Sequence, residues 1–234
     1  MAEEPESASQ DQPRAAEAGV RWMLRDRLLA AFADCDPDMT RAVLREASAA
    51  LPLARVLTEV IHPALEAMGT LWEQREVTLT QIFLAGAATE DATAELGEEL
   101  PPPPETAPTV VLGTLLDSHH LGARLVGVFL RAAGLRVVDL GAGLSPEELA
   151  TRAAEENAPV VAVSTFLLRS AYRVPAVREE LAHRGLQAAI AVGGAPFRAD
   201  PGLAARVGAD LWAPDAAQAA RLIDLLCTKR FPRP

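Results

Sequence analysis

The sequence predicts an α/β protein in which a four-helix bundle precedes a five-stranded, parallel, doubly wound domain of flavodoxin-like order. Three observations support this prediction. Apolar residues recur at helical spacing through residues 18–100, without the β-branched runs of strands. Four consecutive prolines then interrupt the chain within residues 101–108. From Thr109 onward, short apolar runs alternate with helical segments, as in a parallel sheet covered by helices.

Composition and charge exclude several classes of function. With 234 residues the chain can hold one large domain or two small ones. The net charge of −10 argues against a nucleic-acid partner, because phosphate binding requires clustered Lys and Arg. There is no apolar run near the ~20 residues of a membrane span, and the polar N-terminus lacks the apolar run of a signal peptide. The two cysteines have neither metal-ligand nor disulfide-framework spacing, so we expect a cytoplasmic protein without membrane association.

The N-terminal part is expected to be a tail followed by a bundle. Residues 1–17 are charged and have no periodic apolar face, which predicts a disordered acidic tail. Asp36-Pro37-Asp38 combines a helix stop with a new helix start. A loop is expected around residues 69–78, with Trp72 as its buried anchor. Short connections of this kind predict an antiparallel bundle, residues 18–100. The expected helices are 19–34, 38–50, 52–71 and 78–98.

The proline-rich segment 101–108 is expected to be an extended linker to the second domain, residues 109–234. Apolar runs such as Pro159–Val163 suit strands that are buried on both faces of a parallel sheet. Such sheets bind ligands beyond the carboxyl ends of their strands, here after the first, third and fourth. The expected strands are 109–115, 135–140, 159–165, 188–192 and 209–212. The expected helices are 121–133, 146–157, 171–184, 200–207 and 215–228.

Three short segments fall at these strand ends, namely Asp117–Gly122, Ser164–Leu168 and Gly193–Pro196. In the first, an Asp precedes a His by two residues, so its carboxylate can hold one imidazole nitrogen while the other faces a metal. The glycines of the third allow close approach of a ligand to the backbone. Taken singly, the three segments are equally compatible with a satisfied loop histidine, a capping serine and an ordinary glycine turn.

Together, these segments resemble the signature of the cobalamin (B12)-binding domain family: Asp-x-His-x-x-Gly, then Ser-x-Leu, then Gly-Gly. The separations also resemble those of the family, with 41 residues between Gly122 and Ser164 and 26 between Phe166 and Gly193. Phe166 stands where the family usually has Leu, and its larger apolar side chain still suits a slot for the cofactor tail. The resemblance implies that His119 coordinates cobalt from the lower face, in place of the cofactor's own dimethylbenzimidazole, and that Asp117 hydrogen-bonds the imidazole.

The resemblance also implies further contacts with the cofactor, whose displaced nucleotide tail would lie in a channel lined by Gly122, Ser164 and Gly193-Gly194. Ser170 occupies the position of a serine that completes the relay from Asp117 in family members. His120 is outside the motif and is expected to be solvated or to touch the nucleotide tail of the cofactor. Methylcobalamin is the expected form, with adenosylcobalamin and hydroxocobalamin as alternatives. The implied cofactor-binding residues in this domain are Asp117, Ser118, His119, Gly122, Ser164, Phe166, Leu167, Ser170, Gly193 and Gly194.

The helical domain resembles the cap of methionine synthase and of small corrinoid proteins that carry methyl groups. The stretch Val60–Gly69, followed by Trp72, carries this resemblance. Such a cap would shield the upper face of the cofactor from water and oxygen. Trp72, Ile82 and Phe83 are the candidates for that surface, and ordinary bundle core is the alternative for all three.

We therefore expect a corrinoid methyl carrier that works with separate methyltransferase subunits and is one component of their system. The alternative is a cobalamin-dependent sensor that acts through a regulatory protein partner. A photoreceptor is disfavoured, because such proteins carry Glu-His nine residues beyond the Trp, where this chain has Ile82-Phe83. A mutase subunit would need a barrel, which the sequence lacks, and a cobalamin-free flavodoxin-like protein leaves the motif spacing unexplained.

Overall fold

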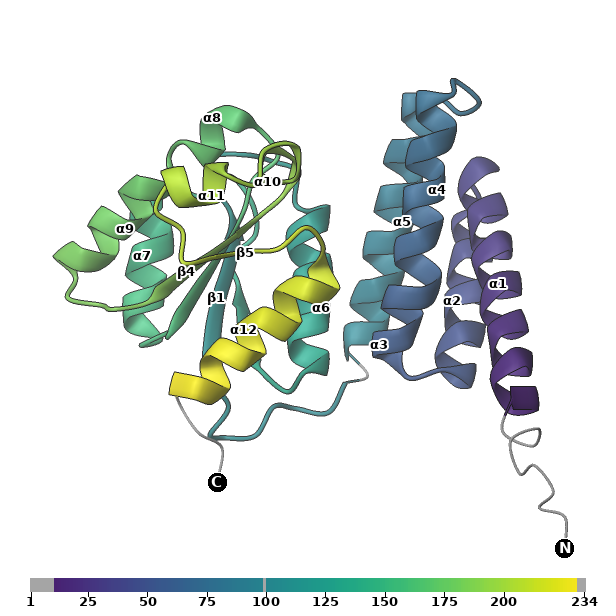
Figure 1. The fold of residues 1–234 in the computed structure, drawn as a ribbon, viewed down its shortest axis with the longest axis horizontal. Coiled ribbons are helices and arrows are strands. Elements are labelled where there is room, and N and C mark those ends of the chain that lie inside the picture. Colours follow the sequence, from purple (N-terminus) through teal and green to yellow (C-terminus); the bar gives the residue numbers. More distant parts are fainter. Residues whose placement is uncertain (1–10, 99, 231–234) are drawn as a thin grey trace, which may run out of the picture. The chain divides into compact units, whose positions relative to one another are not determined.

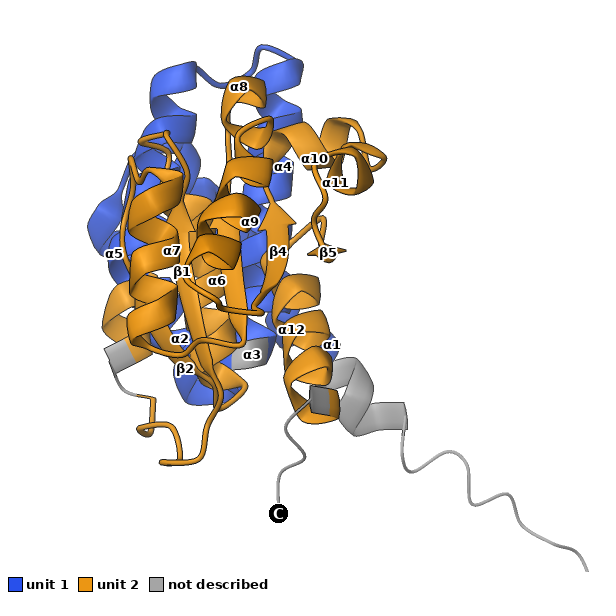
Figure 2. Cartoon of the chain, turned by 90° about the vertical axis from the view of Figure 1, so that its left-hand side faces the viewer, with its two compact units in different colours: residues 1–92 blue, residues 93–234 orange. Residues whose placement is uncertain are grey.

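The computed structural model describes residues 11–98 and 100–230 and divides into two compact units, residues 1–92 and 93–234 (Figures 1 and 2). The predicted fold class is confirmed, because helices make up the first unit and a five-stranded parallel sheet with flanking helices forms the second. The domain limits and the linker inferred from the sequence remain a proposal. Residues 1–10 of the proposed tail lie outside the described residues.

The helical unit contains the four helical stretches expected from the sequence. The second begins where predicted, because the Asp36 carboxylate caps it by accepting a hydrogen bond from the Met39 N–H at 2.9 Å. The third stretch contains a six-residue π-helical segment. The bounds are α1 Asp11–Ala33, α2 Pro37–Ala50, α3 Leu53–Arg55, η2 Val56–Ile61, α4 His62–Glu73 and α5 Leu79–Glu98. The buried core includes Leu24, Leu28, Phe32, Val43, Leu44, Leu57, Ile61 and Met68.

Two predictions for this unit were wrong in detail. Helix α1 begins at Asp11, well before the predicted residue 19, because the intervening residues are mostly good helix formers and Pro13 lies in the first turn. Helix α4 runs through Gly69 to Glu73, and it ends where Arg75 adopts a left-handed conformation with φ of 63°. Trp72 therefore ends a helix with 48% of its surface exposed and anchors no loop.

The second unit is a parallel sheet of strand order β2-β1-β3-β4-β5 with helices on both faces (Figure 1). Helices α6 and α12 pack together, as do α7 and α9. Strands β1, β3 and β4 are buried along almost their whole length, as their continuous apolar sequences predict. The strands are β1 Thr109–Thr114, β2 Arg136–Asp139, β3 Val160–Ser164, β4 Ala189–Gly193 and β5 Leu211–Trp212. The helices are α6 Leu121–Ala132, α7 Pro146–Glu155, α8 Leu168–Ala171, α9 Val174–His183, α10 Ala195–Ala199, α11 Leu203–Arg206 and α12 Ala216–Arg230.

The helix predicted over 171–184 corresponds to α9, which begins later, at Val174, because Pro175 is tolerated in the first turn of a helix and not in its interior. A separate short helix, α8, precedes it. The helix predicted over 200–207 corresponds to α11, and the short helix α10 lies before the predicted range. Among the described helices, none combines the length and apolar composition needed to cross a membrane.

Candidate cofactor site

The three motif segments meet at one edge of the sheet. Thr114 pairs with Ser164 at the ends of β1 and β3, and Ser164 pairs with Gly193 at the end of β4. The loops that follow these strands therefore start side by side. The direction of strand order changes between β1 and β3, which is the position where open α/β sheets bind their ligands.

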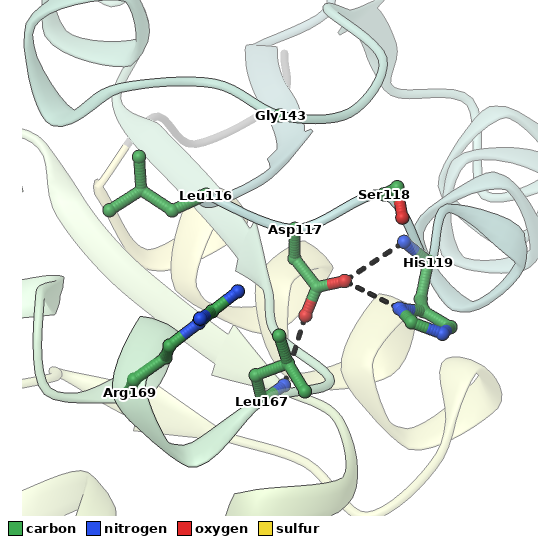
Figure 3. A pocket seen from close by; sticks show the side chains of 7 residues that line it. All are labelled: Leu116, Asp117, Ser118, His119, Gly143, Leu167 and Arg169. Carbon is green, nitrogen blue, oxygen red and sulfur yellow. Dashed lines mark hydrogen bonds and ion pairs between the residues drawn. The ribbon is translucent and has the colours of Figure 1, made fainter.

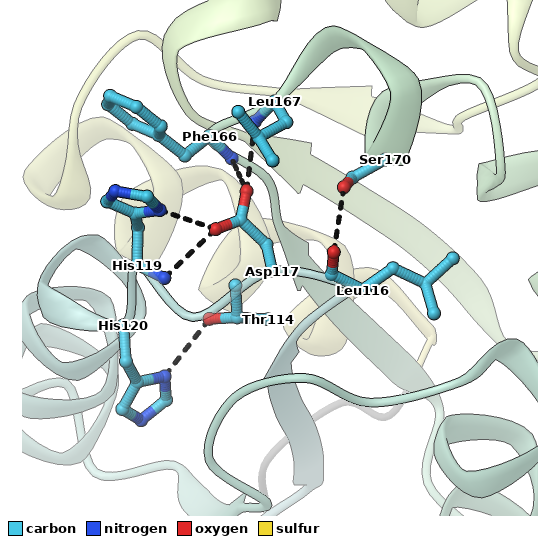
Figure 4. A network of polar contacts seen from close by, with 8 residues as sticks. All are labelled: Thr114, Leu116, Asp117, His119, His120, Phe166, Leu167 and Ser170. Carbon is cyan, nitrogen blue, oxygen red and sulfur yellow. Dashed lines mark hydrogen bonds and ion pairs between the residues drawn. The ribbon is translucent and has the colours of Figure 1, made fainter.

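Asp117 is the polar centre of this edge (Figure 4). Its side chain is completely buried, and its Oδ1 lies 2.6 Å from the Nδ1 of His119 and accepts from the His119 backbone N–H at 3.0 Å. Its Oδ2 accepts hydrogen bonds from the backbone N–H groups of Phe166 at 3.1 Å and Leu167 at 2.9 Å. Burial favours a higher pKa for Asp117, but these hydrogen bonds outweigh it and hold the pKa below its ordinary value. The carboxylate therefore stays ionised at neutral pH.

His119 presents one nitrogen outward from this anchor (Figure 3). A carboxylate only accepts hydrogen bonds, so the proton of a neutral His119 belongs on Nδ1 and the lone pair on Nε2. The His119 side chain is 54% exposed, and its ring stacks on that of Phe166, with centroids 4.1 Å apart and planes 20° apart. The imidazole is thus fixed in direction by Asp117 and in plane by Phe166, while Nε2 is free to bind a metal.

A hollow of about 410 Å³ lies beside His119 (Figure 3). Its lining includes Ser118 and Leu167, which the sequence predicted, and Arg169, an exposed cation that the sequence analysis did not select. Arg169 lies three residues after Phe166, in the short helix α8 that follows β3, and its place in this segment could have indicated it. The residues that line the hollow are Leu116, Asp117, Ser118, His119, Gly143, Leu167 and Arg169.

The structure places Ser170 differently from the expected relay. Its hydroxyl donates to the backbone carbonyl of Leu116 at 3.3 Å, while the buried Asp117 oxygens are taken up by His119 and by two backbone amides. Leu116 has a φ of 49°, a left-handed conformation that costs free energy for a residue with a side chain. Its N–H donates to the Leu144 carbonyl at 2.9 Å. Ser170 thus helps to hold the strained turn that leads into Asp117.

The residues expected along the nucleotide tail are partly brought together. A side chain added at Gly122 would place its Cβ 3.7 Å from the Ser164 hydroxyl, so α6 begins next to the end of β3. Gly194 has a φ of 112°, and a Cβ there would lie 1.8 Å from the Thr165 carbonyl oxygen. Close packing of backbone therefore requires this glycine, independently of any ligand. The Thr165 hydroxyl is buried without a hydrogen-bond partner among the described residues, as expected where a polar ligand binds.

His120 is not the solvated or tail-contacting residue that the sequence suggested. Only 12% of its side chain is exposed. Its Nδ1 lies 3.0 Å from the Thr114 hydroxyl (Figure 4). Its Nε2 lies 3.3 Å from an Asp139 carboxylate oxygen. No sequence pattern indicates this contact, because it joins residues at the ends of two different strands.

The candidate cap residues lie at one end of the helical unit. Trp72 ends α4 and Phe83 lies early in α5, on the two sides of the 74–78 connection. Trp72 is 48% exposed, Phe83 is 74% exposed and Leu79 is 66% exposed, whereas Ile82 is half-buried. Bundle core is therefore excluded for Trp72 and Phe83, whose side chains are apolar and exposed.

Comparison with known families agrees with this geometry. A family model described as a B12 binding domain matches residues 108–221, and a second model of the same description matches residues 24–96. The two matches together span most of the chain, which therefore belongs to the B12-binding domain family. Cobalamin is the cofactor that membership of this family implies.

Individual relatives match this chain over nearly their whole length. A corrinoid protein of Desulfitobacterium hafniense is 28% identical over 214 residues, which are 88% of this chain and 98% of the relative. Dimethylamine corrinoid protein 2 of Methanosarcina acetivorans is 27% identical over 212 residues, 88% of this chain and 97% of the relative. The structure of the monomethylamine corrinoid protein of Methanosarcina barkeri superimposes with a TM-score of 0.75 at 25% identity, over 88% of this chain and 99% of that chain.

The metal-ligating side chains at this edge suit a metal that a macrocycle already holds. Among the residues that the structure describes, there is no cluster of three or more His, Cys, Asp or Glu side chains able to hold a bare metal ion. In cobalamin the macrocycle itself holds the cobalt, so the protein would supply at most one further donor. A single exposed imidazole nitrogen, oriented by a buried carboxylate, would suit such a group.

Proposed function

We propose that this chain is a corrinoid methyl carrier in which His119 supplies the lower axial ligand of cobalt. The observation that carries the proposal is the contact between the buried Asp117 carboxylate and His119 Nδ1, which leaves the lone pair of Nε2 available to a metal. Cobalamin, when bound, supplies a cobalt centre that accepts and releases a methyl group. Asp117 fixes the tautomer of the imidazole and raises the electron density at Nε2.

The remaining residues of this edge bind and orient the cofactor in the proposal. Ser118 and Leu167 line the hollow beside His119 and would contact the corrin ring. Gly122, Ser164 and Gly193 would border the space for the nucleotide tail. Phe166 acts on the imidazole rather than in a slot for the tail. Gly194 and Ser170 act through the backbone, and the exposed Trp72 and Phe83 are candidates for contact with the upper face of the cofactor.

The stacking of Phe166 on His119 gives a modest, measurable prediction. Aromatic pairs of this geometry contribute about 0.5–1.5 kcal/mol. We expect Phe166→Leu to weaken hydroxocobalamin binding by about threefold to tenfold, because the imidazole must then be ordered on binding. Binding is measured by spectrophotometric titration of the apoprotein. Trp22→Leu, which removes an exposed aromatic ring from α1, is the control, and equal effects of the two substitutions would contradict a role specific to the His119 ring.

The names of the relatives suggest which methyl donors to examine first. They are called dimethylamine, trimethylamine and monomethylamine corrinoid proteins. We therefore propose a methylamine as the methyl source and separate methyltransferases as the partners that load and unload this chain.

A methyl-transfer assay tests this proposal. The full chain, reconstituted with hydroxocobalamin and reduced, is incubated with an isotope-labelled methylamine and candidate methyltransferases. We expect label to be retained on the chain and then released when a second methyltransferase and its methyl acceptor are added. His119→Ala should retain much less label, whereas His183→Ala, which removes an exposed histidine on α9, should behave as wild type. Bound cofactor without label retention, together with a light- or ligand-dependent change in oligomeric state, would contradict the carrier and favour the sensor.

A further inference from the structure

The loop that carries His119 is held by polar contacts on both sides of β1. On one side, Asp117 accepts the hydrogen bonds of Phe166 and Leu167, which follow β3 (Figure 4). On the other side, His120 contacts Asp139 at the end of β2. Since β1 lies between β2 and β3 in the sheet, the two contacts hold the loop from opposite directions.

Both nitrogens of His120 are engaged in this contact. The Asp139 carboxylate only accepts, so a neutral His120 carries its proton on Nε2 and donates it there. The fully buried Thr114 hydroxyl, 3.0 Å from Nδ1, then donates to the remaining lone pair. Asp139 also accepts the Gly141 N–H at 2.9 Å, which fixes the carboxylate at the end of β2. His120 therefore has no lone pair left for a metal, in contrast to His119.

His120 directly follows His119 in the chain, so the position of its backbone affects the orientation of the His119 imidazole. Only Ser118 and His119 separate the two fastened residues, Asp117 and His120. His120 has helical backbone angles, φ −94° and ψ −13°, and its carbonyl accepts the Arg124 N–H at 3.0 Å, so it also fixes the first turn of α6. A shift of the His120 backbone would rotate the adjacent imidazole directly, and ligand groups act effectively only within a narrow range of position and angle.

We propose that His120 is a positioning residue for His119. Its bridge from Thr114 to Asp139 fixes the loop in the arrangement in which His119 Nε2 meets the cofactor. This inference rests on the proposed role of His119 as the axial ligand. His120, Thr114 and Asp139 then form one hydrogen-bonded group, and substitution of any of the three should reduce ligation of cobalt by His119.

The test measures how much bound cofactor has a histidine nitrogen on cobalt. The full chain is labelled with ¹⁵N-histidine, loaded with hydroxocobalamin and reduced to cob(II)alamin, and its EPR spectrum is recorded. Coupling to ¹⁵N gives a doublet, whereas the ¹⁴N of dimethylbenzimidazole gives a triplet, so the two ligands are distinguished. We expect His120→Ala to retain the cofactor and to lower the ratio of histidine-bound to histidine-free cobalt by about tenfold, the effect of losing a charge-assisted hydrogen bond.

Three further variants separate positioning from a general loss of structure. Asp139→Asn should lower the ratio in the same direction, and adding it to His120→Ala should cause no further fall. His120→Gln, which can still bridge polar groups, should recover part of the ratio, and His183→Ala should not change it. Thr114→Val removes only one of the two contacts, and it is the variant to measure if His120→Ala does not fold.

The outcomes are distinct. A wild-type ratio in both His120→Ala and Asp139→Asn overturns the inference and leaves the role of His119 intact. Loss of the doublet in His120→Ala, with its retention in His119→Ala, would make His120 itself the ligand and also overturns it. If the labelled wild-type protein shows no doublet, the proposed axial ligation fails before any variant is compared.

Discussion

His119→Ala is expected to weaken hydroxocobalamin binding by at least about 100-fold and to remove the protein ligand from cobalt. The reason is structural. In this described loop Asp117 holds His119 Nδ1, so that Nε2 is available to cobalt, whereas both nitrogens of His120 are engaged by Thr114 and Asp139. The substitution should change the stability of the apoprotein by less than about 1 kcal/mol, since the side chain is more than half exposed. Spectrophotometric titration and urea unfolding measure the two quantities.

His183→Ala is the matched control for this substitution, because His183 is an exposed histidine in the last turn of α9. It should bind hydroxocobalamin as the wild-type chain does. Wild-type affinity in His119→Ala would show that the loop does not ligate the cofactor. A large loss of stability in His119→Ala would mean that the imidazole is structural, contrary to its exposure.

Asp117→Asn should destabilise the apoprotein by about 2–4 kcal/mol and weaken hydroxocobalamin binding by about 10–100-fold. The buried carboxylate accepts from four N–H groups, two on His119 and one each on Phe166 and Leu167. An asparagine side chain replaces one acceptor oxygen by a donor NH₂ group, which must then face N–H groups without a partner. The His119 ring also loses the charge that assigns its proton to Nδ1.

Urea unfolding of the apoprotein and titration with hydroxocobalamin measure the two effects of Asp117→Asn. Asp26→Asn is the control, because Asp26 forms an exposed ion pair with Arg25 and exposed pairs contribute little. Wild-type stability in Asp117→Asn would contradict the buried hydrogen-bond network. Normal affinity despite lowered stability would separate Asp117 from the orientation of His119.

Much of the site could be predicted from the sequence because parallel strands converge at one edge. Asp117, Ser164 and Gly193 are far apart in the chain, but each follows or ends a buried apolar run, so their proximity follows from topology. The Asp-x-His pairing is local and therefore also predictable. The structure places the two side chains in contact, as the spacing suggested.

The contacts that sequence reasoning missed depend on loop conformation. Ser170 reaches the Leu116 carbonyl because Leu116 has a positive φ, which no sequence pattern of this segment indicates. Phe166 stacks on His119 across two loops, and its apolar character alone suggested a slot for the tail. His120 turns toward Asp139 at the end of an edge strand, a direction that spacing in the chain cannot supply.

In the helical unit, the errors have a similar origin. Trp72 was expected to be buried because large aromatic side chains usually anchor loops, yet the helix continues past Gly69 and leaves the indole half exposed. An interior glycine costs a helix only about 1 kcal/mol, which packing of the buried face readily offsets. The buried residues Ala64 and Met68 of α4 provide that packing.

The central claim is that His119 Nε2 binds cobalt, and the most direct test is the cob(II)alamin EPR spectrum of the ¹⁵N-histidine-labelled chain compared with that of labelled His119→Ala. The claim predicts doublet coupling in the wild-type protein and its disappearance in His119→Ala. A spectrum that does not respond to labelling, or a doublet that survives in His119→Ala, would contradict it.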